Sequence, residues 1–137
     1  MLGPVEPAYR FVEHVGELEL ELRAPTEAGI FAAALGALAE LIADGGPGEP
    51  AEHGVELSGA DPALLLVDWL DELVYLAETA GFVPERVSSL EVDDGGLRAR
   101  VAGFRGSPRH LVKAVTLHRL DLHEDADGWR GRVVLDV

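Results

Sequence analysis

Carboxylates at the end of the sequence are the residues whose types and spacing best suit chemistry. Asp136 precedes Val137, so its side chain lies beside the terminal α-carboxylate. Hard divalent cations favour such clusters of oxygen ligands. We therefore consider a divalent-metal site here, against the commoner alternative that Asp136 is a solvated acid at the end of a strand.

A second set of candidate ligands lies near the beginning of the sequence. His14 and Glu17 are three residues apart on either side of Gly16, where an extended segment is expected to break. This spacing at a strand irregularity can turn both side chains toward one ion. The alternative is a surface histidine followed by a solvated row of glutamates, and the residues alone favour that alternative.

His118 lies on an expected strand from Val112 to His123. Alternation along that strand places His118 on the same face as Thr116 and Leu120, toward the apolar layer. A half-buried histidine needs a polar partner. A structural hydrogen bond is the commoner solution, and a carboxylate partner would instead make His118 part of a site.

Asp68, Asp71 and Glu72 lie within one turn of an expected helix that contains no basic residue. Like charges at this spacing destabilise a helix by roughly 0.2–0.5 kcal/mol per pair. Either the patch is simply solvated, or a cation or a basic partner neutralises it.

Two helices and six or seven strands are expected to position these residues. Thr26 can cap a helix that runs to about Asp44, and Asp61 followed by Pro62 begins a second helix that Gly81 ends. Alternating or β-rich segments predict the strands Tyr9–Ala24, His53–Ser58, Arg86–Asp93, Leu97–Gly103, Val112–His123 and Trp129–Val137. We expect an α+β layered single domain over residues 9–137, after a flexible lead-in of residues 1–8. Its mixed or antiparallel β-sheet carries the two main helices packed on one face.

Composition excludes several classes of function. The formal net charge of −14, from 25 acids and 11 bases, repels phosphate backbones, so direct nucleic-acid binding is not expected. The absence of cysteine excludes disulfides and thiolate catalysis. No apolar run has the length of a membrane span and no signal peptide is evident, so we expect a cytoplasmic protein without membrane contact.

Several segments together resemble the archease family. The resemblance covers essentially the whole chain, and the segment around Asp68-Trp69 is among the most specific. The matching segments are Tyr9-x-Phe11-x-Glu13-His14, Leu65–Leu73, Lys113-Ala-Val-Thr116-x-His118 and Val133–Val137.

The resemblance implies a protein that is not an enzyme but activates the tRNA-splicing RNA ligase, promoting guanylylation of the ligase and multiple turnover. It also implies a divalent-metal site, typically for calcium, with Glu17, Asp136 and the Val137 carboxylate as ligands. The residues expected to support the site or to contact the partner are His14, Asp68, Lys113, Thr116 and His118.

Two departures from the family pattern bear on the metal site. The family's early motif has the form His-Thr-Ala-Asp, whereas this chain has His14-Val-Gly-Glu17, and Leu117 replaces a frequent tyrosine. Glutamate keeps the charge of aspartate but moves its oxygens outward by about one C–C bond. The alternatives to a ligase activator are a metal-dependent phosphate-ester hydrolase and a chaperone-like interaction domain for RNA-modifying enzymes.

Overall fold

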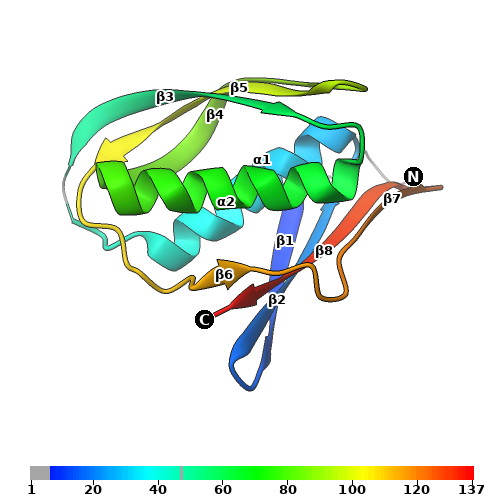
Figure 1. Ribbon diagram of the computed structural model, residues 1–137, viewed down its shortest axis with the longest axis horizontal. Helices are drawn as coiled ribbons and strands as arrows, with labels where there is room; N and C mark the ends of the chain where they lie inside the picture. Colours follow the sequence, from blue (N-terminus) through cyan, green and yellow to red (C-terminus); the bar gives the residue numbers. More distant parts are fainter. Residues whose placement is uncertain (1–6, 47) are drawn as a thin grey trace, which may run out of the picture.

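Two antiparallel β-sheets enclose two α-helices in the computed structural model, which describes residues 7–46 and 48–137 (Figure 1). Figure 1 shows α1 and α2 between the strands β3, β4 and β5 on one side and the strands β1, β2, β6 and β8 on the other. The main core therefore lies between the sheets, around the helices.

The larger sheet has five strands: β1 (Ala8–His14), β2 (Glu17–Ala24), β6 (Ala114–Val115), β7 (Asp121–Asp125) and β8 (Gly128–Asp136). β2 pairs with β1 on one side and with β8 on the other. The far edge of β8 is shared, because β7 pairs with its first half and β6 with its last residues. Leu18, Leu20 and Leu22 point from β2 into the core, so the alternating acids of β2 lie on the outer face.

The smaller sheet has the strand order β3-β5-β4, formed by β3 (Glu49–Ser58), β4 (Phe82–Asp93) and β5 (Gly96–Arg105). Val55, Leu97 and Val101 are buried and belong to the same core as the strands of the larger sheet. This sheet covers the helices on the side opposite the larger sheet (Figure 1).

Helix α1 (Glu27–Ile42) begins at Thr26, whose hydroxyl accepts a hydrogen bond from the Gly29 amide at 3.0 Å. Buried side chains occur on nearly every side of this helix, because it lies between two sheets: Ile30, Phe31, Ala33, Ala34, Leu35, Ala37, Leu38 and Ile42.

Helix α2 (Pro62–Ala80) begins after the Asp61 cap and ends at Gly81, which adopts the left-handed conformation with φ 64°. The indole Nε1 of Trp69 donates a hydrogen bond of 2.9 Å to the carbonyl of Phe31 and so ties α2 to α1. One face of α2 packs in the core and the other carries its acids, so α2 is an amphipathic helix.

The predicted α+β class, antiparallel pairing and both capped helices are confirmed. The strands form two sheets, however, and the helices lie between them. Of the predicted lead-in, residues 1–6 lie outside the described residues, and Ala8 already belongs to β1.

The prediction of one continuous strand from Val112 to His123 is wrong. The chain makes a turn after β6, closed by a hydrogen bond of 3.3 Å from the Leu120 amide to the Leu117 carbonyl. The Thr116 hydroxyl accepts from the His118 amide, which favours a local turn over continued sheet pairing. His118 is consequently exposed and does not face the apolar layer.

Candidate functional site

The register of the larger sheet brings the candidate ligands from both ends of the sequence together. Glu17 lies directly opposite His14 on β1 and directly opposite Asp136 on β8. Directly opposed residues of antiparallel strands point to the same face, with Cβ atoms about 4.5–5.5 Å apart. The structure thus brings residues 14–17 next to the end of β8, and we call His14, Glu17 and Asp136 the acidic tip.

Backbone hydrogen bonds hold the acidic tip in place. The Val137 amide donates to the carbonyl of Gly16 in the β1–β2 turn at 3.4 Å, and the Lys113 amide donates to the carbonyl of Asp136 at 2.8 Å. Thr116 donates to the Val134 carbonyl twice, from its amide at 3.0 Å and from its hydroxyl at 2.8 Å. Lys113 and Thr116, both predicted to support the site, therefore help to position the end of β8.

An arginine that the sequence analysis missed lies against the acidic tip. Arg119 Nη2 is 3.2 Å from Glu19 Oε1 and 3.7 Å from Glu17 Oε2. Its backbone has φ 54°, the only positive φ of a non-glycine residue within the described part of the chain. Nothing local signals this conformation, because left-handed turns favour glycine, asparagine and aspartate over arginine.

The acidic tip does not contain a complete set of side-chain ligands for a metal. Across residues 7–46 and 48–137, no three histidine, cysteine or acidic side chains come close enough together to hold an ion. The tip offers two opposed carboxylates, and the Arg119 guanidinium already interacts with one of them. Calcium takes six to eight oxygen ligands, so these side chains do not fit a preformed calcium site.

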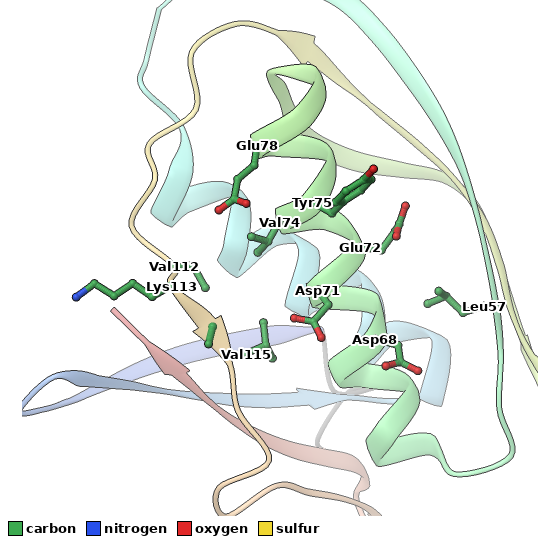
Figure 2. Close-up of a pocket in the computed structure, with 11 residues that line it drawn as sticks. Leu57, Asp68, Asp71, Glu72, Val74, Tyr75, Glu78, Val112, Lys113 and Val115 are labelled. Carbon is green, nitrogen blue, oxygen red and sulfur yellow. The ribbon is translucent and has the colours of Figure 1, made fainter.

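A groove adjoins the acidic tip between α2 and the segment that contains β6 (Figure 2). Its volume is about 560 Å³, and both Asp68 and Lys113 line it. The tip and the groove share one structural support, since Ala114 of β6 lines the groove and pairs with Asp136. Two predicted supporting residues line neither feature: Thr116, which holds β8 through its hydrogen bonds to Val134, and His118, which lies exposed in the turn after β6.

The acids of the groove are not neutralised by its lysine. Figure 2 shows the Lys113 side chain extending away from α2, while Asp71 and Glu78 point from the helix toward the β6 segment. Burial raises the pKa of the Asp71 carboxyl, and the nearby charge of Asp68 raises it further. The groove is therefore an electrostatically unrelieved acidic surface that suits a cationic partner group.

Comparison with known proteins places this geometry in a family. The model of the archease protein family (MTH1598/TM1083) matches residues 9–137. The chain belongs to the archease family. Curated archeases of Methanosarcina acetivorans and Archaeoglobus fulgidus are 34% and 32% identical to it, and each alignment covers 94% of this chain. The alignments cover 95% and 98% of those two relatives.

Solved structures of archeases have the same fold. The solution structure of protein 1598 of Methanobacterium thermoautotrophicum aligns over 94% of this chain and 98% of its own, with a TM-score of 0.74 and 27% identity. The crystal structure of a Thermotoga maritima archease, described as a possible chaperone, covers 100% of this chain and 98% of its own. Its TM-score is 0.66 at 19% identity, which supports the fold alone. As for membrane contact, none of the helices in the described residues combines the length and the apolarity that a bilayer span requires.

Proposed function

We propose that this archease is a cytoplasmic activator of the tRNA-splicing RNA ligase and that it docks on the ligase through the acidic tip. The observation that carries the proposal is the direct opposition of Glu17 and Asp136 on β2 and β8, in a chain of the archease family. The activator promotes guanylylation of the ligase and supports multiple turnover, without catalysing a reaction of its own.

Charge and rigidity support this role of the acidic tip. A net charge of −14 steers the chain toward basic surfaces, and a ligase that holds RNA has a basic cleft. The two carboxylates come from paired strands whose ends are hydrogen-bonded, so little conformational entropy is lost when they dock. A cationic group of the ligase would replace the Arg119 guanidinium beside Glu17.

The adjoining groove extends the proposed docking surface. Asp68 lies on its α2 side and Lys113 on its β6 side, next to the backbone that holds Asp136. A basic segment of the ligase placed over the groove would relieve the repulsion between Asp68 and Asp71. His118 is exposed in the same turn as Arg119, whose guanidinium lies beside Glu17 of the acidic tip.

Calcium binding by Glu17, Asp136 and the Val137 carboxylate is a separate prediction. Because the described side chains supply too few ligands, the docking proposal uses the carboxylates without an ion. Calorimetric titration of the isolated protein with calcium, and with manganese for comparison, tests the ion directly. Heat of binding that disappears in Asp136→Asn would establish the calcium site, and the absence of heat at millimolar calcium would contradict it.

Guanylylation of the cognate ligase, measured with and without this protein, tests the docking proposal. Asp136→Asn keeps the shape of the side chain and removes its charge, so we expect stimulation to fall about tenfold or more. Glu56→Gln is the matched control, since Glu56 is an exposed acid on β3 of the other sheet. Equal stimulation by the two variants, or none by the unmodified protein, contradicts the proposal.

A further inference from the structure

A groove rich in arginine lies on the outer face of the larger sheet, at the end away from the acidic tip. Its volume is about 670 Å³, within the range of small-molecule sites. Its basic side chains come from β1, β2, β7 and β8, and we call them the basic groove: Arg10, Arg23, His123, Arg130 and Arg132. Four of the chain's 11 lysines and arginines are thus gathered in one groove of a protein with 25 acids.

The register sets like charges directly against each other in this groove. Arg23 on β2 lies opposite Arg130 on β8, so two guanidinium groups face each other across the pair. Directly opposed like charges destabilise an antiparallel pair. A bound anion between Arg23 and Arg130 would turn this repulsion into attraction.

The acids nearby offset only part of the positive charge. Glu21 and Asp121 line the groove and Asp125 pairs with Arg130 beside it, so four arginines and three acids leave a formal charge of +1 before His123 is counted. Arg10 Nε donates to Glu21 at 2.8 Å, and His123 Nδ1 lies 2.8 Å from Asp121. Within the described part of the chain, Arg23 makes no ion pair.

Two of the arginines keep donors for a ligand. Arg130 donates through Nε to Asp125 at 2.7 Å, and Arg132 donates through Nε to the Arg119 carbonyl at 2.8 Å. A guanidinium has five N–H donors, and each of these two arginines uses only its Nε–H in the hydrogen bond described. Terminal guanidinium nitrogens are the groups that bind phosphate oxygens in pairs.

We infer that the basic groove binds a compact anion that bears phosphate groups. A long polyanion is excluded by the rest of the same face, because Glu19, Glu17 and Asp136 follow along the strands. Arg23 and Glu17 are six residues apart on β2, a separation of about 20 Å at the usual rise per residue. A nucleic-acid strand extending that far would meet the acidic tip, whereas a di- or triphosphate ends within the groove. This inference is independent of the proposed docking on the ligase.

Calorimetric titration of the intact protein with inorganic pyrophosphate and tripolyphosphate tests the inference. We expect saturable binding that Arg23→Gln weakens about tenfold or more, since it removes charge-assisted hydrogen bonds. Arg86→Gln on β4 is the matched control and is expected to bind like the unmodified protein, because Arg86 is an exposed arginine of the other sheet. Absence of binding, or an equal effect of the two variants, overturns the inference.

A gain of affinity provides a second test that misfolding cannot imitate. Asp125→Asn removes the charge that holds Arg130, while its amide oxygen can still accept the turn hydrogen bond from the Asp127 amide. We expect Asp125→Asn to strengthen tripolyphosphate binding severalfold, and unchanged or weaker binding counts against the inference.

A nucleoside triphosphate and a short RNA, titrated in parallel, distinguish the sources of the phosphate. Binding of the triphosphate as tight as that of tripolyphosphate identifies free nucleotides as ligands of the groove. Tighter binding of the RNA, lost in Arg23→Gln, would overturn the claim that the anion is compact.

Discussion

The two ends of one sheet face differ in how their charges are neutralised. At the acidic tip, Glu17 and Asp136 are opposed, and Arg119 from a neighbouring turn reaches Glu17. At the basic groove, Arg23 and Arg130 are opposed, and Asp125 at the end of β7 reaches Arg130. Each end thus holds an opposed pair of like charges of which one member has a partner. The outer face of the larger sheet therefore carries two incomplete sites of opposite sign.

Destabilising the larger sheet should impair the acidic tip and the basic groove together. Leu20 is 1% exposed and lies on the inner side of β2, between the two regions. Leu20→Ala is expected to lower the free energy of unfolding by about 2–5 kcal/mol, through lost burial and a cavity. Chemical denaturation measures the loss. If either ligase stimulation or anion binding failed to decline in step with the folded fraction of the variant, the two ends would not depend on one sheet.

Reversing one charge should separate the two ends. Glu17→Arg places a second guanidinium beside Arg119 and opposite Asp136, so the acidic tip loses its negative charge. We expect ligase stimulation to fall by about tenfold or more, while tripolyphosphate binding changes less than twofold. The reciprocal variant, Arg23→Glu, should lose tripolyphosphate binding and keep ligase stimulation. A variant that lost both activities while remaining folded would refute the separation.

Removing Arg119's charge should make the tip more acidic at a small cost in stability. Arg119→Gln loses the contacts with Glu17 and Glu19, which are partly exposed ion pairs worth about 0.2–1 kcal/mol each. We expect a slightly lower free energy of unfolding and stronger stimulation of ligase guanylylation, because Glu17 is released for a cationic group of the ligase. Weaker stimulation would show that Arg119 positions Glu17 and does not compete for it.

The acids of α2 provide the smallest expected effect. They contrast with the acidic tip, because within the described residues no arginine forms an ion pair with them. The pKa of Asp71 is raised in the folded protein, so the folded state binds this proton more tightly than the unfolded state does. Stability therefore falls as the pH rises through the interval between the unfolded and the raised folded pKa of Asp71. Asp71→Asn removes the repulsion from Asp68 and should raise the free energy of unfolding at pH 7 by about 0.2–0.5 kcal/mol.

Denaturation of Asp71→Asn at several pH values checks the sign. Its advantage over the unmodified protein should shrink as the pH falls through the folded pKa of Asp71, which lies above 3.8, because the unmodified side chain then becomes neutral. An advantage that grew on acidification would contradict the assigned cause. Glu56→Gln serves again as the control, because it removes one exposed acid and leaves Asp68 and Asp71 in place.

Features that depend on local chemistry could be predicted from the sequence. Thr26, Asp61 and Gly81 mark helix ends because capping and left-handed termination involve neighbours within a few residues. The outward row of acids on β2 follows from strict alternation, which needs no partner strand to be recognised. The predicted strand over residues 112–123 is wrong because local alternation does not reveal tertiary contacts. Alternation there is regular, but a turn that packs over β8 interrupts the strand.

The sequence by itself determined the α+β class, the two helices, the acidic character and the family resemblance. Only the tertiary structure decided which charges meet. The oppositions of Glu17 with Asp136 and of Arg23 with Arg130 depend on pairing between strands more than 100 residues apart in the chain. The left-handed conformation of Arg119 depends on the same tertiary contacts, because the Arg132 side chain on β8 donates a hydrogen bond to the Arg119 carbonyl. A one-residue shift of register would move each side chain to the other face, so global packing alone sets these sites.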